Sequence, residues 1–153
     1  MSSLRTILVP HDFSPPSRAA FILAEELADL ANARIHLLHV VHTPMLHAVT
    51  PSGPLQLALP DVVVTGAAHE AGETLHRIAG ESRREVEVHV TEGLPTDAIC
   101  TVADQLHADL IVMGTHGREG LSHLLLGSVA ERTLRRAPCP VLTVRAAAEA
   151  EAP

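Results

Sequence analysis

The sequence predicts a single α/β domain: a five-stranded parallel sheet with helices on both faces, in a doubly wound arrangement of three layers. Short apolar runs alternate with segments of helical periodicity along the whole chain. The runs at 6–10 and 110–113 are continuously apolar, as in parallel strands that are covered on both faces. The length of 153 residues and the 46% hydrophobic content suffice for one core. We expect the domain to span 1–145, followed by a flexible tail at 146–153.

The N-terminal part contains the first strand, a helix and the second strand. The first strand, at 6–10, is followed by Ser14, which is a natural N-cap, and by Pro15 at the first helical position. The helix is predicted to run to about Asn32, and the second strand covers 34–41. The predicted apolar stripe of this helix consists of Ala20, Leu23, Leu27, Leu30 and Ala31.

The connection at 42–60 is expected to be irregular, because four prolines and Gly53 interrupt it. A connection of this length is uncommon unless it is mobile or acts as a lid. Asp61 is expected to cap the helix that follows. The predicted stripe of that helix consists of Val64, Ala68, Ala71, Leu75 and Ile78.

The C-terminal part repeats the alternation of strands and helices. A strand with alternating charged and apolar residues is expected at 85–91, as near a sheet edge. Gly93 and Pro95 lead into a third helix, and the apolar run at 110–113 is the next strand. A fourth helix is expected at about 129–136 and a last strand at 141–145.

Composition argues against several classes of function. The formal net charge is −7 and aromatic residues make up 1%, whereas nucleic-acid binding favours a basic face and stacking rings. No apolar run is long enough to span a membrane, and the first ten residues enter a strand pattern without room for a signal peptide. We therefore expect a cytoplasmic protein without a membrane or nucleic-acid partner. Cys100 and Cys139 form no CxxC or zinc pattern and are expected to be buried, reduced thiols.

The chain contains no lysine, so all 11 basic residues are arginines. A P-loop uses a lysine to reach the terminal phosphates, and Schiff-base or pyridoxal chemistry also needs one. These classes are therefore excluded.

A glycine-rich stretch follows the strand at 110–113. Gly114 and Gly117 are separated from Gly127 and Ser128 by an intervening segment, and a helical pattern begins at Val129. Glycines admit positive φ and let backbone N–H groups approach an anion, while a helix N-terminus adds unpaired donors. The stretch is thus suited to holding phosphates. The alternative interpretation is that the same residues form two ordinary turns and an N-cap. The guanidinium of Arg118 reaches the phosphates or is a solvated loop residue.

The spacing G-x-x-G-x9-G-[ST] resembles the ATP-binding signature of the universal stress protein family. The segments ILVPHDFS, LHVV, DLIVMG and APCPVLTVR resemble the same family in the same order, across 6–145. The resemblance implies the Rossmann-like strand order 3-2-1-4-5. In this order the switch point, where open α/β sheets bind ligands, lies between strands 1 and 4.

The resemblance also implies roles for residues at the ends of the strands. Pro10 and Val40 match the adenosine pocket, where Val40 meets adenine through its backbone, and Met113 would line the same pocket; Val40 and Met113 also suit a core. Asp12 lies near the ribose and phosphates or stabilises its own turn. His11 departs from the small residue expected at its position.

The chain has eleven histidines, but no HExxH or Cys/His ligand set, so we predict no metal ligands among them. His36 and His39 should face opposite sides of their strand, and scattered surface histidines are the preferred interpretation. His116 is the exception, because its place in the glycine turn allows contact with a nucleotide.

The resulting hypothesis is an ATP-binding regulator of the stress response that senses adenine nucleotide, with or without Mg²⁺. One alternative is a slow ATPase that uses Asp12, His116 and Arg118 in the same crevice. Another is a dimeric interaction module that binds no nucleotide. The resemblance further implies a homodimer through the last strand, at 141–145.

Overall fold

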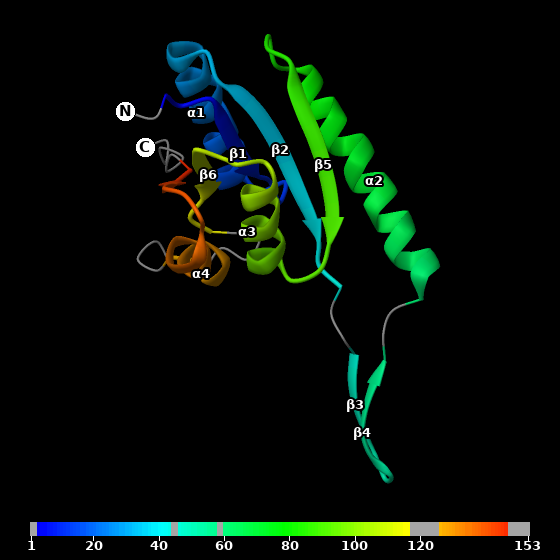
Figure 1. Ribbon diagram of the computed structural model, residues 1–153. Coiled ribbons are helices and arrows are strands. Elements are labelled where there is room, and N and C mark those ends of the chain that lie inside the picture. Colours follow the sequence, from blue (N-terminus) through cyan, green and yellow to red (C-terminus); the bar gives the residue numbers. More distant parts are fainter. Residues whose placement is uncertain (1–2, 44–45, 58–59, 117–125, 147–153) are drawn as a thin grey trace, which may run out of the picture.

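The computed structural model describes residues 3–43, 46–57, 60–116 and 126–146, and it contains a five-stranded parallel sheet (Figure 1). The strand order is β5-β2-β1-β6-β7, with β1 at the centre. The strands are β5 (Val86–Glu92), β2 (Arg34–Val41), β1 (Thr6–Pro10), β6 (Leu110–Gly114) and β7 (Val141–Val144). When the separate β3–β4 hairpin is not counted, this order is the predicted 3-2-1-4-5.

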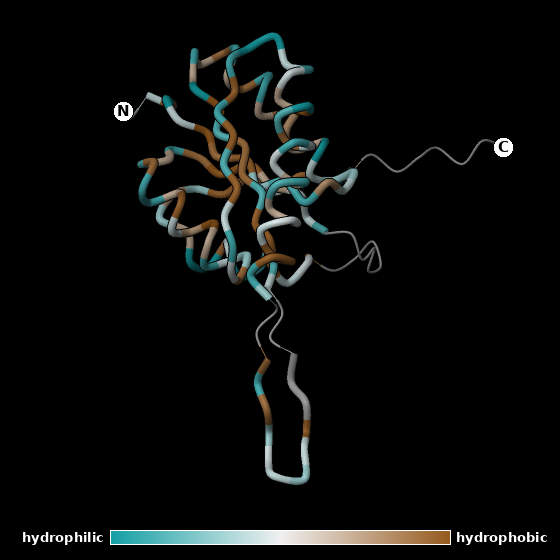
Figure 2. The backbone as a smooth tube through the Cα atoms, turned by 90° about the vertical axis from the view of Figure 1, so that its right-hand side faces the viewer, coloured by the Kyte–Doolittle hydropathy of each residue, from teal (hydrophilic) through white to brown (hydrophobic). Residues whose placement is uncertain are grey.

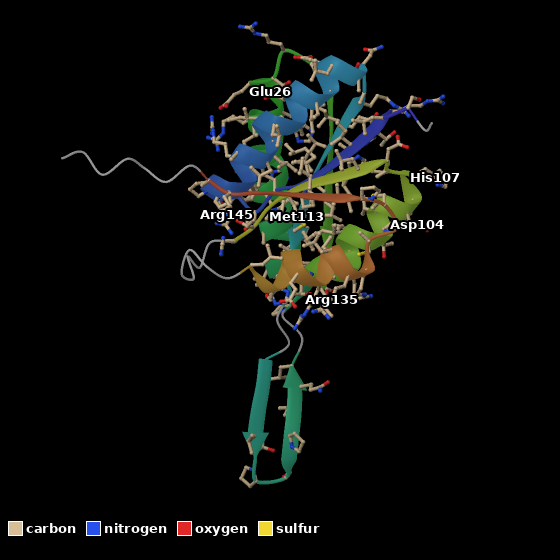
Figure 3. All side chains as sticks on the ribbon, turned by 90° about the vertical axis from the view of Figure 1, so that its left-hand side faces the viewer. Glu26, Asp104, His107, Met113, Arg135 and Arg145 are labelled. Atoms are coloured by element: carbon tan, nitrogen blue, oxygen red, sulfur yellow. The ribbon has the colours of Figure 1, made fainter. Side chains whose placement is uncertain are left out.

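Helices cover both faces of the sheet. Helices α1 (Pro15–Ala31) and α2 (Asp61–Gly80) pack on one face, and α3 (Pro95–Gln105) and α4 (Ser128–Arg136) pack on the other. Figure 3 shows Met113 inside the domain and Glu26, Asp104 and Arg135 on its outer side. Within the described residues, no helix combines the length and apolar character that a bilayer span requires.

The continuous apolar run of β1 is explained by its position in the sheet, where both of its faces are covered. Ile7 and Val9 point into the core beneath α1 and α2, whereas Leu8 points into the core beneath α3 and α4. All three side chains are fully buried, because a central parallel strand has a helix layer on each side.

Helix α1 begins as predicted but buries a different stripe. The Ser14 hydroxyl accepts a hydrogen bond from the Ser17 backbone N–H, and Pro15 occupies the first turn. The prediction for Leu30 and Ala31 is wrong, since both are exposed. The small alanines let the helix lie close to the sheet, so its packed face follows them. This face consists of Ser17, Ala20, Phe21, Ala24 and Ala28.

The connection at 42–60 is not irregular, contrary to the prediction. It contains an antiparallel hairpin of β3 (Leu46–Thr50) and β4 (Gly53–Leu57), which projects away from the sheet (Figures 1 and 2). Pro51 lies in the turn, and Gly53 follows it with a φ of 122°, so these residues make the turn of a hairpin and do not prevent one.

Helix α2 begins differently from the prediction. Its N-cap is Pro60, and Asp61 is the first helical residue and makes no capping hydrogen bond. An acidic side chain in the first turn still interacts favourably with the helix dipole. Two members of the predicted stripe, Ala71 and Leu75, are buried and attach the helix to the core.

Asp109 ties the start of β1 to the start of β6. Its Oδ2 atom accepts hydrogen bonds from the backbone N–H groups of Arg5 and Thr6, each at 2.9 Å. The Asp109 backbone N–H in turn donates to the carbonyl of Thr6 at 2.9 Å. Strands β1 and β6 therefore run in step, and their carboxyl ends meet at one edge of the sheet.

Candidate functional site

A cleft of about 1170 Å³ lies at the carboxyl ends of β1, β2 and β6. It is also lined by the first turns of α3 and α4 and by one side of α2. Every predicted site residue within the described part of the chain lines this cleft; Gly117 and Arg118 lie outside that part. The lining residues that sequence predicted are Pro10, His11, Asp12, Val40, Met113, Gly114, His116, Gly127, Ser128 and Val129.

The two ends of the glycine-rich stretch are hydrogen-bonded to each other. The Gly127 backbone N–H donates to the carbonyl of Thr115 at 2.7 Å, and Thr115 donates to Val144 of β7 at 2.9 Å. Gly127 is the N-cap of α4, and its carbonyl accepts from Glu131 N–H. The first residues of α4 are thereby fixed beside the end of β6, with the helix N-terminus at the cleft.

Gly114 and Gly127 are required by close packing and not by positive φ, which corrects one part of the prediction. Among the described glycines, only Gly53 and Gly93 have a positive φ. A Cβ atom at Gly114 would lie 2.8 Å from Pro16 Cβ and 2.9 Å from the Ser17 nitrogen. A Cβ atom at Gly127 would lie 2.9 Å from the Thr115 carbonyl oxygen. The absence of side chains lets the cleft walls approach each other.

Asp12 stabilises its own turn. Its Oδ1 atom accepts hydrogen bonds from the backbone N–H of Ser14, at 3.0 Å, and from the Ser14 hydroxyl. The interpretation of Asp12 as a residue that stabilises its own turn is therefore confirmed. Because Asp12 also lines the cleft, its contact with a ligand stays a prediction.

His11 is a buried, neutral member of the cleft wall. Its Nδ1 atom accepts a hydrogen bond from Phe13 N–H at 3.1 Å, so the ring proton is on Nε2. Nε2 is itself buried and has no hydrogen-bond partner among the described residues. Burial lowers the pKa of His11 to about 4, although the neighbouring Asp12 carboxylate acts in the opposite direction.

His39 and Phe13 support the His11 backbone. His39 Nδ1 donates to the His11 carbonyl at 2.7 Å, and the Phe13 ring stacks on His39 with centroids 4.5 Å apart. Phe13 has a φ of 66°, an uncommon conformation for a side chain of this size. Neither His39 nor Phe13 was predicted as a site residue. Both line the cleft: His39 lies near the end of β2, and Phe13 lies in the turn after β1.

His116 has one ring nitrogen engaged and one without a partner. Its Nδ1 atom lies 2.9 Å from the Thr115 hydroxyl. Its Nε2 atom is buried and makes no hydrogen bond with a described residue. Buried polar atoms usually have a partner. The walls of the cleft thus contain two buried histidine nitrogens, on His11 and His116, that have no hydrogen-bond partner among the described residues.

Two arginines of α4 that were not predicted from the sequence also line the cleft. Val129, Arg132 and Arg136 follow one another at helical spacing and all face it. Arg136 Nη1 is paired with Asp97 Oδ1 at 2.5 Å, whereas Arg132 makes no ion pair with any described residue. The spacing of these residues after Gly127 was the signal that could have identified them.

The start of α3 also belongs to the cleft and was not predicted. Leu94 is 60% exposed and lines the cleft with Pro95 and Thr96. Together with Val40 and Met113, Leu94 gives the cleft apolar surface, while α4 supplies backbone donors and arginines. The arrangement can therefore hold a ligand that has both an apolar part and an anionic part.

The burial of His11 predicts a loss of stability in mild acid. The unfolded chain takes up a proton near the ordinary pKa of 6.5, but the folded chain does not until about pH 4. The free energy of unfolding should therefore fall by about 3 kcal/mol between these values. His11→Asn has no titrating group at this position, so this component should vanish, while the side-chain oxygen can still accept from Phe13 N–H. Urea unfolding followed by far-ultraviolet circular dichroism across this range measures the difference.

The control is His107→Asn, which removes an exposed histidine at the end of α3. It should lose as much stability on acidification as the wild type. Parallel curves of unfolding free energy against pH for the wild type and His11→Asn would contradict the assignment.

Comparison with known proteins agrees with this geometry. The model of the universal stress protein family matches residues 3–145. A universal stress protein of Methanocaldococcus jannaschii is 33% identical over 141 residues, which cover 92% of this chain and 82% of that protein. The structure of the universal stress protein UspA from Lactobacillus plantarum superposes with a TM-score of 0.74 and 28% identity, covering 95% of this chain and 100% of that chain. A universal stress protein in complex with cAMP gives a TM-score of 0.62 and 26% identity, with 95% and 100% covered. The chain therefore belongs to the universal stress protein family.

Proposed function

We propose that this chain binds an adenine nucleotide, ATP with Mg²⁺, in the cleft and acts as a nucleotide-dependent regulator of a stress response. The observation that carries the proposal is the convergence of the predicted residues. Segments far apart in the sequence, at Pro10–Asp12, Val40, Met113–Gly114 and Gly127–Val129, line a single cleft. The relative in complex with cAMP supports an adenine nucleotide as the class of ligand.

The phosphates belong at the first turn of α4. Three successive residues, Gly127, Ser128 and Val129, offer backbone N–H groups or a hydroxyl there, although the Gly127 N–H already binds Thr115. The positive end of the helix dipole points the same way. Arg132 adds a cation that no described carboxylate neutralises, and Arg118 would add another.

The adenosine belongs at the apolar end of the cleft. Pro10, Val40 and Met113 come from three adjacent strands and present apolar surface at the carboxyl edge of the sheet. The exposed side chain of Leu94 lies across the same cleft and would be covered by a bound base. The proposed orientation therefore places the base near β2 and the phosphates near α4.

The hairpin at 46–57 is not a lid in this structure. None of its described residues lines the cleft, and both strands project away from the sheet (Figure 2). The proposed sensing of nucleotide therefore relies on the cleft walls and not on closure by this segment.

Ser128→Asp separates nucleotide binding from stability. An acidic residue in the first turn of α4 is favourable for the helix, so the unfolding midpoint should be unchanged or slightly higher. The same carboxylate would repel the phosphates, so the affinity for Mg-ATP should fall about tenfold or more. Ser128→Ala should lose about two- to tenfold, the contribution of one hydrogen bond. Isothermal titration calorimetry at fixed ionic strength measures these affinities.

Gln105→Glu is the matched control, since it adds the same charge at an exposed position of α3 that does not line the cleft. Its affinity should equal that of the wild type. The proposal fails if the wild type binds no Mg-ATP, or if Ser128→Asp and Gln105→Glu bind it equally well.

We also propose that the chain forms a homodimer through β7. This strand is at the edge of the sheet and pairs, among the described strands, only with β6. Its Leu142 side chain is 38% exposed. An apolar edge strand offers unpaired backbone groups to a second copy, which would continue the sheet.

Leu142→Glu should convert the dimer into a monomer, because a charge at the paired edge would be buried between the copies. Sedimentation velocity should show a dimer for the wild type and for Ile22→Glu, which places the same charge on the exposed side of α1. A monomeric wild type, or a dimer that survives Leu142→Glu, would rule out this interface.

A further inference from the structure

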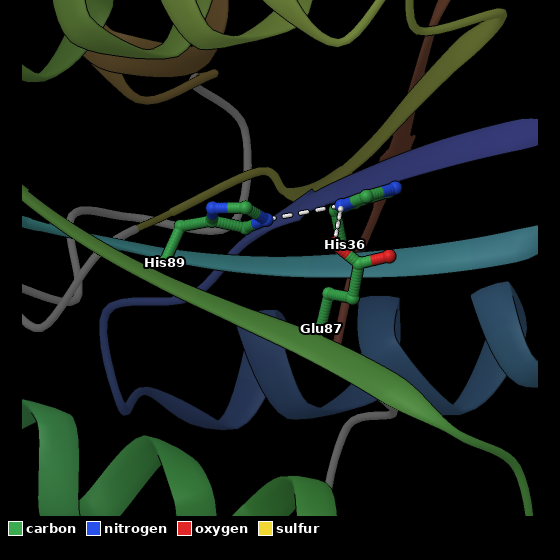
Figure 4. A group of neighbouring side chains, drawn as sticks. All are labelled: His36, Glu87 and His89. Carbon is green, nitrogen blue, oxygen red and sulfur yellow. Dashed lines mark hydrogen bonds and ion pairs between the residues drawn. The ribbon is translucent and has the colours of Figure 1, made fainter.

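Three potential metal ligands lie together on two neighbouring strands, away from the nucleotide cleft. They are His36 of β2 and Glu87 and His89 of β5 (Figure 4). In the parallel register His36 lies opposite Glu87, and Leu38 lies opposite His89. Because side chains alternate along a strand, all three project from the same face of the sheet.

The separations suit one shared cation. His36 Nδ1 lies 3.0 Å from His89 Nε2 and 3.5 Å from Glu87 Oε2. The three ligand atoms all lie within 4.8 Å of one another. In a tetrahedral zinc site with bonds of about 2.0–2.2 Å, neighbouring ligand atoms lie roughly 3.3–3.5 Å apart. Small side-chain rotations would therefore bring all three atoms to bonding distance.

We infer that His36, Glu87 and His89 form a binding site for a divalent transition-metal ion of the zinc class. Two imidazole nitrogens and one carboxylate oxygen match the ligand preference of zinc, and they differ from the all-oxygen sets that Mg²⁺ and Ca²⁺ prefer. Within the described residues, no other trio of His, Cys, Asp and Glu side chains brings its ligand atoms this close. A water molecule would complete the coordination.

The surroundings give the site one fixed and two adjustable ligands. His36 is 4% exposed and lies on the face of β2 that carries Leu38, which packs beneath α3. Helix α2 covers the opposite face of β5, through Val86, Val88 and Val90. The Glu87 side chain is 53% exposed, so an ion can enter from solvent at this edge.

The metal-free state needs only a tautomer change to accept the ion. At present one of the two facing nitrogens must donate to the other, since the two rings are hydrogen-bonded. Burial lowers the pKa of His36, against the opposing effect of Glu87, so the ring is neutral at pH 7 and retains a lone pair. On binding, the shared proton moves to the remote nitrogen of the same ring, and both facing lone pairs bind the metal.

A sequence-level prediction of this site was out of reach, and the preference for scattered surface histidines is wrong for His36. The signals were present as His36 in one strand and Glu87-x-His89 in another. Only the register between β2 and β5 brings them together.

The test uses Zn²⁺ alone, added to the chelator-treated protein without nucleotide, in competition with a chromogenic chelator. The wild type should bind one Zn²⁺ per chain with high affinity, and His89→Gln and Glu87→Gln should weaken this site at least about tenfold. These two substitutions alter side chains that are not fully buried, and circular dichroism verifies their fold. Mg²⁺ should not compete at equal concentration.

His69→Gln is the matched control. His69 and Glu73 on α2 are also 3.5 Å apart, but they have no third ligand among the described residues. This variant should keep the affinity of the wild type. The inference is overturned if the wild type has no tight site, or if His69→Gln weakens binding as much as His89→Gln does.

A second readout uses Co²⁺ in place of Zn²⁺. A site with nitrogen and oxygen ligands gives ligand-field bands in the visible range without sulfur-to-metal charge transfer. Intense charge-transfer absorption would place the metal at Cys100 or Cys139 and would overturn the assignment. The expected bands should disappear in His89→Gln and persist in His69→Gln.

Discussion

The close approach of α1 to the end of β6 is the constraint on which the cleft depends. Gly114 has no Cβ, and any side chain there would collide with the backbone of Pro16 and Ser17. This contact holds the first turn of α1 against β6, while Asp109 joins the start of β6 to the start of β1. Because the start of β6 is tied to the start of β1 and its end lies against the first turn of α1, the turns after β1 and β6 line one cleft. The same glycine that a phosphate-binding interpretation explains is thus also demanded by packing.

The cleft combines features that stability alone does not explain. His11 and His116 each bury a ring nitrogen that has no partner among the described residues, and Arg132 lacks an ion pair there. Buried polar atoms without partners cost free energy in the folded protein. An anionic ligand would pair with Arg132 and accept from the backbone donors at the start of α4, which is why the proposed nucleotide fits this cleft better than an apolar ligand would.

The strands and the N-cap of α1 could be predicted because their signals are local: a continuous apolar run, or a Ser-Pro pair before a helix. The glycine motif identified Gly114, Gly127 and Ser128 for the same reason, whereas Pro10 and Val40 were assigned from the resemblance to the family. The hairpin at 46–57 was not predicted, because prolines that end one element also form a turn between two. Leu94 required knowledge of which end of α3 meets the cleft, whereas Arg132 has a sequence signal in its helical spacing after Gly127. His36, Glu87 and His89 required the register of β2 against β5, a long-range property that no local pattern encodes.

The most direct measurement of the central claim is the ultraviolet spectrum of the purified protein, followed by chromatography of its acid extract. The chain has no Trp or Tyr, so the polypeptide is nearly transparent near 280 nm, and a bound base would dominate the ultraviolet absorbance. The account predicts an adenine nucleotide in the extract, or its uptake when Mg-ATP is added. A protein that carries no nucleotide and also fails to bind added Mg-ATP would contradict it.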